Sequence, residues 1–324
     1  MGPAAIVIYS ALAFALPSGD HKHTTPMGVK EPGVQRPIAN IQPDAVFPVE
    51  GSPDWVTILP DSVWIGNNPK GSIARLDPKT NKVAAIIAVG KITCAGLAAG
   101  FGSIWVPSCG DKALYRVDVA TNKVVAKIPL GPADTEGAIA ASEDSIWYLT
   151  DTRGTLVRID PATNQPVAEI AVPPGSVAAA YGEHAIWITS PEQNTLTKVD
   201  PQTNLVTATI NVGKTPRFLA VGEGAVWTLN QGDGTVSRVD PKTSRVVAVI
   251  DAGIPGPGGD IATGEGSVWV TMHDVPLGRI DPETNKMVQQ WVGPGGDSLR
   301  VGLGSIWLTN YKQQTVWRVN PKQP

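Results

Sequence analysis

The chain has 324 residues, 42% of them hydrophobic and 17% charged, so it is long enough to bury a large core in one domain or two. Its net charge of −3 argues against nucleic acid and anionic membrane surfaces as partners. Glycine and proline occur 34 and 29 times, which is typical of many short strands joined by tight turns.

The first predicted element is an apolar run of 13 residues, 4–16. It is shorter than the roughly 20 residues that a membrane-spanning helix needs. Ala11, Ala13 and Ala15 offer Ala-x-Ala cleavage sites, although no Lys or Arg precedes the run as in an ordinary signal peptide. We predict a signal peptide over 1–16, a flexible linker over 17–44, and a secreted or periplasmic mature chain without a membrane span. A buried N-terminal strand or helix is the alternative.

From residue 45 to the end the chain repeats one pattern. Tryptophan recurs every 38 to 42 residues, at positions 64, 105, 147, 187, 227, 269 and 307. An Arg/Lys-x-Asp/Asn motif ends 12 or 13 residues after each tryptophan, and a DPKTN-like turn follows most of these motifs. Such a period of about 40 residues predicts an all-β propeller with one four-stranded blade per repeat, and hence seven blades. Because these features occur in every repeat, we expect buried tryptophans between blades, and turn or surface ion-pair roles for the Arg/Lys-x-Asp motifs.

The two ends of the repeat region complement each other. The seventh repeat stops at TVWRVNPKQP, before any outer strand, whereas residues 45–51 (AVFPVEG) match the outer strand at 85–90 (AIIAVG). We therefore predict that the N-terminal strand completes the last blade, closes the ring and removes an exposed sheet edge.

The phrases VWIGNN, IWLTN and VWTLN, followed later by DPKTNKV or DPKTSRV, resemble the YVTN-type propeller repeats of exported bacterial and archaeal proteins. The blades are also similar to those of the streptogramin (virginiamycin B) lyase superfamily. The resemblance covers about residues 45–324 and implies the fold, whereas activity depends on the site that each fold carries.

We expect functional residues at positions where one repeat differs from the others. Ligands of propellers usually meet the mouth, which is formed by the starts of the inner strands and the ends of the second strands. Counting back about ten residues from each tryptophan finds charged side chains at this level: Asp54, Glu136, Arg217, Asp260 and Asp297. Arg300 lies slightly further along its strand, where most other repeats have alanine. We predict that these six residues form a ligand-binding rim.

Two other interpretations of the rim stay open. The charges form a solvated ring in which Arg217 neutralises its neighbours, or Arg300 pairs with a rim acid instead of binding an anion through its planar fork.

The chain has two cysteines, Cys94 at the start of an inner strand and Cys109 at the end of the following tryptophan strand. Counted outward from the turn between these strands, they fall opposite each other. In an exported protein this arrangement predicts a disulfide at the same rim; a free thiol or nucleophile is the alternative.

His273 interrupts the sixth repeat in a loop shortened by one residue, at the mouth end of its strand. The streptogramin lyases use histidines and a glutamate around a divalent metal at this mouth, so the resemblance implies a similar place for His273. The equivalent positions of the other repeats contain no second histidine or glutamate. Two interpretations stay open. His273 acts as a general base together with Asp260 or Asp274, or it is a polar surface residue.

These patterns lead to two functional hypotheses. The first is an exported propeller that binds a small ligand or an extracytoplasmic protein partner at its mouth. The second is a metal-assisted lyase or hydrolase of esters or lactones, with His273 and Asp260 as catalytic residues and a divalent ion such as Mg²⁺ held by rim carboxylates. No cofactor is established by the sequence.

Overall fold

The computed structural model describes residues 29, 31–68, 70–133 and 136–323. The predicted signal peptide, 1–16, lies outside these residues. In the described part of the chain, no helix is both long and apolar enough to cross a membrane.

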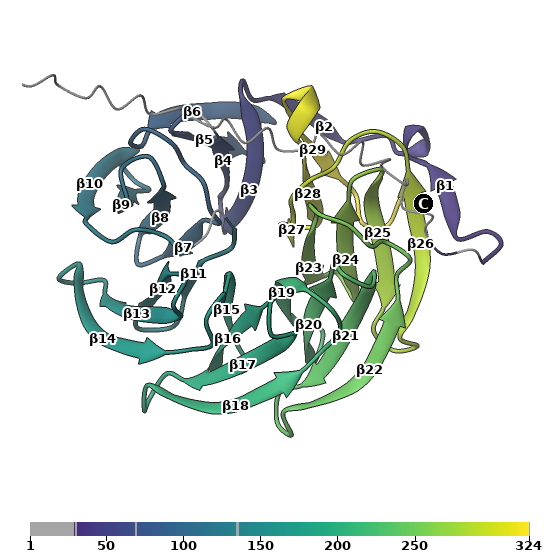
Figure 1. Ribbon diagram of the computed structural model, residues 1–324. Helices are drawn as coiled ribbons and strands as arrows, with labels where there is room; N and C mark the ends of the chain where they lie inside the picture. The colour runs from purple at the N-terminus through teal and green to yellow at the C-terminus, as the bar shows by residue number, and fades with distance from the viewer. Residues whose placement is uncertain (1–28, 30, 69, 134–135, 324) are drawn as a thin grey trace, which may run out of the picture.

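The described strands form seven sheets arranged as a ring of blades (Figure 1). Blades 1 to 3 contain β3 (Ser52–Leu59), β4 (Ser62–Asn68), β5 (Ser72–Asp77) and β6 (Lys82–Ala88); β7 (Ala98–Gly100), β8 (Ser103–Ser108), β9 (Ala113–Asp118) and β10 (Lys123–Ile128); β11 (Ile139–Ala141), β12 (Ile146–Asp151), β13 (Thr155–Asp160) and β14 (Gln165–Ala171). Blades 4 to 6 contain β15 (Ala178–Gly182), β16 (Ala185–Ser190), β17 (Thr195–Asp200) and β18 (Leu205–Asn211); β19 (Pro216–Gly222), β20 (Ala225–Asn230), β21 (Thr235–Asp240) and β22 (Arg245–Asp251); β23 (Asp260–Gly264), β24 (Ser267–Met272), β25 (Val275–Asp281) and β26 (Lys286–Val292). Blade 7 contains β27 (Leu299–Gly302), β28 (Ser305–Asn310), β29 (Thr315–Val319) and β2 (Ala45–Pro48), with the short 3₁₀ helix η2 (Tyr311–Gln313) between β28 and β29.

The ring is closed as the sequence predicted. β2 pairs antiparallel with β29, from Ala45 opposite Arg318 to Pro48 opposite Thr315. Phe47 and Val49 are each 1% exposed, and Phe47 packs against Trp307 with ring centroids 5.7 Å apart. The N-terminal strand therefore supplies both the missing edge and part of the core of blade 7.

The repeated tryptophans all lie in the second strand of their blades and are at most 1% exposed, which confirms their predicted place in the core. In every repeat the Arg or Lys of the following motif lies over this indole, 4.8 to 5.6 Å from the ring centroid. Such cation–π contacts stabilise the pair most where water is excluded.

The arginines also join neighbouring blades. The sequence predicted turn or surface ion-pair roles for them and did not predict these contacts between blades. Arg116 donates from Nη1 to the Asn164 side chain and to the carbonyl of Pro161, both in the turn of the next blade. The asparagine of this turn has φ of 60°, a left-handed conformation that asparagine tolerates well. The equivalent bond to a backbone carbonyl of the next blade is made by Arg75, Arg158, Lys198, Arg238 and Arg318.

Part of the predicted linker is ordered against blade 6. Within 17–44, β1 (Gln35–Pro37) pairs in parallel with β26, and the 3₁₀ helix η1 (Ile38–Asn40) follows it. Ile38 and Ile41 are 8% and 4% exposed and join the core that contains Trp291. The sequence predicted a linker because this segment is polar and rich in proline. That composition gives no sign that two of its isoleucines are buried.

Candidate functional site

The predicted rim residues come from five blades and converge at one end of the ring. Asp54 lies in β3, Arg217 in β19 and Asp260 at the first position of β23, whereas Glu136 and Asp297 precede β11 and β27. The charges of Glu136, Asp260 and Asp297 all act on the carboxyl group of Asp54. The structure thus brings the six residues together at the mouth.

Both rim arginines are engaged by rim acids. The Arg217 Nη2 atom lies 3.2 Å from Glu136 Oε1, with each side chain about one quarter exposed (25% and 26%). Arg300 Nη1 lies 2.5 Å from Asp260 Oδ2, as the ion-pair interpretation of Arg300 anticipated. Two positive and two negative charges of the rim are therefore matched within the chain.

Asp260 is buried and fully bonded. Its side chain is 2% exposed and, besides Arg300, accepts hydrogen bonds from the Ser298 hydroxyl at 2.7 Å and the Leu299 amide at 3.2 Å. Its other oxygen accepts from the amide of Ile261 at 2.8 Å. Because these donors lie in blades 6 and 7, the geometry gives Asp260 a clear role in joining the two blades.

The carboxyl groups of Asp54 and Asp297 interact at the rim, and both side chains are half-buried. Burial, and then the charges of Asp297, Glu136 and Asp260, raise the pKa of Asp54 well above its usual range. Burial also raises the pKa of Asp297 to about 6, against the lowering effect of the nearby His273.

His273 lies in an exposed turn at the mouth. Met272 pairs with Val275, so His273 and Asp274 form a two-residue turn between β24 and β25. A Cβ atom on Gly258 would lie 2.6 Å from the His273 Nε2 atom, and Gly258 has φ of +87°. The glycine-rich loop therefore packs closely against the imidazole.

The donor set at the mouth does not fit a metal ion. No group of three His, Cys, Asp or Glu side chains among the described residues is placed to hold one. Asp260 is committed to Ser298, Leu299 and Arg300. Only His273 remains of the residues that the resemblance to the lyases implied.

Sequence reasoning missed an aromatic pair in the centre of the ring. Trp55 and Phe218 directly follow Asp54 and Arg217, and their ring centroids lie 5.8 Å apart although blades 1 and 5 are not neighbours. Each is 4% exposed. The signal was available, because nine residues before each repeated tryptophan the chain has Trp55, Gly96, Ala138, Ala178, Phe218, Asp260 and Ser298. Two large rings among mostly small residues fill the centre next to the charged layer.

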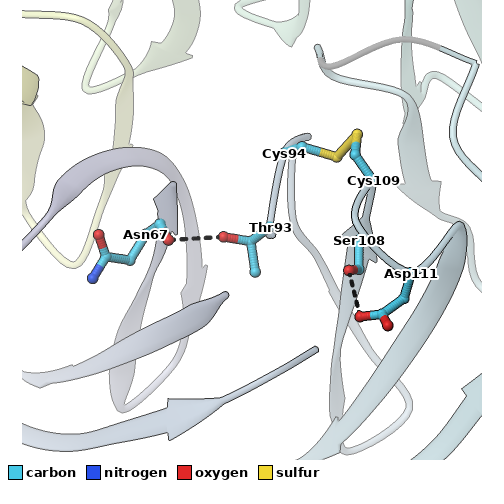
Figure 2. Close-up of a disulfide and its surroundings, with 6 residues drawn as sticks. All are labelled: Asn67, Thr93, Cys94, Ser108, Cys109 and Asp111. Atoms are coloured by element: carbon cyan, nitrogen blue, oxygen red, sulfur yellow. Dashed lines mark hydrogen bonds between the residues drawn. A yellow bond between two sulfur atoms is a disulfide. The ribbon is translucent and has the colours of Figure 1, made fainter. Parts of the chain in front are cut away.

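The predicted disulfide is present at the mouth of blade 2 (Figure 2). Cys94 and Cys109 are joined with a Cα–Cα distance of 5.8 Å. The neighbouring Thr93 hydroxyl donates to the Asn67 carbonyl at 3.0 Å, so the stapled segment also contacts blade 1 (Figure 2). The disulfide thus fixes the connection between two blades at the mouth.

A groove of about 710 Å³ lies away from the predicted site, between blades 5 and 6. It is lined by Glu223, Arg238, Gly266, Arg279, Asp281, Pro282, Glu283 and Val288. Glu223 follows the end of β19, whereas Arg217 lies near its start, so this groove belongs to the opposite face of the ring. None of the predicted rim residues lines it.

Comparison with known proteins agrees with this architecture. Residues 96–256 match the family model of glutamine cyclotransferase. A streptogramin B lyase structure superimposes with a TM-score of 0.69 at 19% identity, covering 84% of this chain and 94% of the other. The fold is that of the streptogramin lyases.

Two structures of virginiamycin B lyase from Staphylococcus aureus are similar to the chain in the same way. The selenomethionine form gives a TM-score of 0.71 at 14% identity, covering 85% of this chain and 98% of the other. A catalytically inactive variant with quinupristin gives 0.70 at 15% identity, covering 83% and 94%. Curated protein sequences gave no match. At these identities the likeness concerns the fold alone.

Proposed function

We propose that this propeller binds a small ligand at its mouth, where Asp54, Glu136, Arg217, Asp297 and Arg300 meet. The observation that carries the proposal is the convergence of charged side chains from several blades next to the Trp55–Phe218 pair. Repeats elsewhere keep small or neutral residues at these positions, so the charges are not required by the blade itself. Polar groups placed next to an apolar centre are typical of small-molecule sites.

Arg217 and Glu136 are the best contacts for such a ligand. Their side chains are about one quarter exposed (25% and 26%), and their ion pair at 3.2 Å presents a donor and an acceptor side by side. A ligand with a carboxylate or amide group would exchange one ion-pair bond for a bond of the same kind. A protein partner that inserts a side chain into the mouth would use the same groups.

A thermal-shift screen of polar metabolites against wild type and Arg217→Ala tests this proposal. We expect at least one compound to raise the melting temperature of wild type and to lose this effect in the variant. Arg245→Ala is the control, because Arg245 is exposed at the start of β22, at the end of its blade opposite the mouth. Hits that stabilise both variants as well as wild type would place the ligand elsewhere.

A metal-assisted lyase or hydrolase is the second candidate, and the position of His273 beside Asp297 favours it. An imidazole next to an ionisable carboxyl group can act as a general base. The described donor set does not fit a metal, so the residues supply a base but not the ion. Elemental analysis of wild type and His273→Ala decides between them: stoichiometric metal that disappears in the variant would support the enzyme.

We also propose that the protein is exported, because disulfides persist mainly in oxidising compartments. Expression with a C-terminal tag, fractionation and N-terminal sequencing would test export together with the predicted cleavage near residue 16. Tagged protein confined to the cytosol with an intact N-terminus would contradict both predictions.

A further inference from the structure

The inner strands of the seven blades surround the axis of the ring (Figure 1). Because side chains alternate along a strand, those that face the axis form layers nine, seven and five residues before the repeated tryptophans. The first of these layers contains Trp55 and Phe218, which meet across the ring, and all seven of its residues are buried. This layer therefore closes the axis directly below the mouth.

Below the closed layer, side chains at the axis are accessible again. The layer seven residues before the tryptophans contains Thr57, Ala98, Ala140, Ala180, Ala220, Ala262 and Arg300. Thr57, Ala180 and Arg300 are half-buried, and so is every position of the layer five residues before the tryptophans. Since the layer above is closed, solvent reaches these two layers from the face opposite the mouth.

Arg300 is held through only one of its nitrogen atoms. Nη1 donates to Asp260 Oδ2 at 2.5 Å and to the carbonyl of Leu299 at 2.6 Å, whereas Nε and Nη2 make no hydrogen bond to any residue that the structure describes. The N–H groups of Nε and Nη2 point the same way along one edge of the guanidinium plane, which is the arrangement that binds both oxygens of a carboxylate. The ion pair with Asp260 thus fixes the guanidinium, whose side chain is 34% exposed, and leaves this edge open.

Thr57 provides a further donor in the same layer. It belongs to blade 1, whose inner strand adjoins that of blade 7, where a Cβ atom on Gly302 would lie 3.1 Å from Ile58 Cδ1. The Thr57 side chain is half-buried, and its hydroxyl has no hydrogen-bond partner within the described part of the chain. The five other positions of the layer are alanine, so the polar groups gather where blades 1 and 7 meet.

We propose that Arg300 and Thr57 bind a small carboxylate at the axis, below the Trp55–Phe218 pair. Its two oxygens accept hydrogen bonds from Nε and Nη2 of Arg300, and the Thr57 hydroxyl donates a third bond. A single negative charge suits this site better than a phosphate dianion, because Arg300 is the only cation in its layer. This site is separate from the ligand site proposed at the mouth, since it opens to the other face of the ring.

The charge of Asp260 is compatible with a second carboxylate on Arg300. Besides Arg300, the Asp260 side chain accepts hydrogen bonds from the Ser298 hydroxyl and from the amides of Leu299 and Ile261. These donors stabilise its negative charge within the protein. The open edge of the guanidinium is therefore available to a ligand without loss of the ion pair.

The depth of the site favours a free molecule over a side chain of a partner protein. Arg300 lies four residues before Gly304 in the turn at the opposite face, and four residues of extended strand span roughly 13 Å. An aspartate or glutamate side chain of a partner docked on that face is too short to cover this distance. The ligand is thus expected to be a small carboxylate in solution.

Sodium acetate is the probe, and sodium chloride at equal ionic strength is the control salt. At ten times its dissociation constant, acetate should raise the ratio of folded to unfolded wild type about elevenfold, which corresponds to a rise in melting temperature of about 3 °C. Thr57→Val removes the hydroxyl with little change of shape and should weaken this effect severalfold. Arg300→Lys keeps the charge but loses the planar edge, and should abolish the effect. Thr207→Val, an exposed change in β18, is the matched control and should respond like wild type.

Nuclear magnetic resonance of isotope-labelled acetate measures binding directly on wild type. We expect the carboxyl resonance to broaden in proportion to protein concentration, and to broaden less with Thr57→Val. Acetate that neither broadens with wild type nor stabilises it would overturn the site, and so would equal responses of wild type, Thr57→Val and Arg300→Lys. Because Arg217 and Glu136 stay unchanged in this experiment, its failure would leave the ligand proposed at the mouth unaffected.

Discussion

Replacement of Asp260 by alanine is expected to be among the most damaging single changes at the mouth. The carboxylate is 2% exposed and accepts bonds from Arg300, Ser298 and Leu299. In Asp260→Ala these donors lose their acceptor, and the Arg300 guanidinium loses its counter-charge in a place where its side chain is only 34% exposed. The change therefore leaves several polar groups unpaired at once.

The expected cost follows from these contacts. Breaking a buried ion pair by removing one partner costs about 3–5 kcal/mol. Because Arg300 is partly exposed and can turn toward water, the lower part of this range is the better expectation, about 3 kcal/mol. At roughly 2 °C per kcal/mol for a chain of this length, the melting temperature should fall by about 6 °C.

Calorimetry at pH 7 on wild type, Asp260→Ala and Asp260→Asn measures this effect. The asparagine variant keeps an acceptor oxygen for Ser298 but loses the charge, so it should lie between the other two. Restoration of stability by adding Arg300→Met to Asp260→Ala would identify the unpaired guanidinium as the main cost. If Asp260→Ala melted within a degree of wild type while a ligand bound less well, Asp260 would be a binding residue and the structural role assigned here would be wrong.

Three further changes test the scaffold. Reduction of the Cys94–Cys109 disulfide, whose cysteines are 15 residues apart, should lower the free energy of unfolding by about 3 kcal/mol. Denaturant titration measures this loss, and the control is a Cys94→Ser/Cys109→Ser variant, which should not respond to reductant. Arg158→Ala should lower the free energy of unfolding by about 2–3 kcal/mol, because it removes the bonds to Pro201 and Asn204 and the contact with Trp147. Arg158→Lys should cost less, because Lys198 makes the equivalent carbonyl bond in its own blade. Equal losses of stability in the two variants would contradict the cross-blade bond as the cause. Deletion of residues 44–50 should lower the melting temperature of the whole ring in one cooperative step because β2 completes blade 7, and an unchanged melting curve would show that β2 is not needed for closure.

The blades could be predicted from the sequence because the information for them is local. The position of each tryptophan, the alternating runs around it and the DPKTN turns all lie within about 40 residues, and each repeat confirms the others. Ring closure was also predictable, since a missing outer strand at one end matched a spare strand at the other. Cys94 and Cys109 could be paired because they flank the two neighbouring strands of one hairpin, β7 and β8.

The contacts between blades were less accessible to sequence reasoning. The cross-blade bond from Arg116 to Pro161 joins residues 45 positions apart, and the repeat alone gives no reason to connect them. β1 was assigned to a linker because its pairing with β26 is more than 250 residues away in the chain. Comparison of position 55 with position 218 would have indicated the aromatic pair, but not that the two rings meet.

The positions of the residues within the repeat were enough to predict which of them lie at the mouth, because equivalent positions of every repeat lie at the same end of the ring. The tertiary structure decided what those residues do to one another. It turned Asp260 inward to Arg300, paired Arg217 with Glu136, and placed Asp54 and Asp297 where burial raises the pKa of both. The physical reason is that burial and the distance between charges set the pKa of a carboxyl group, and both depend on how the blades pack around the axis.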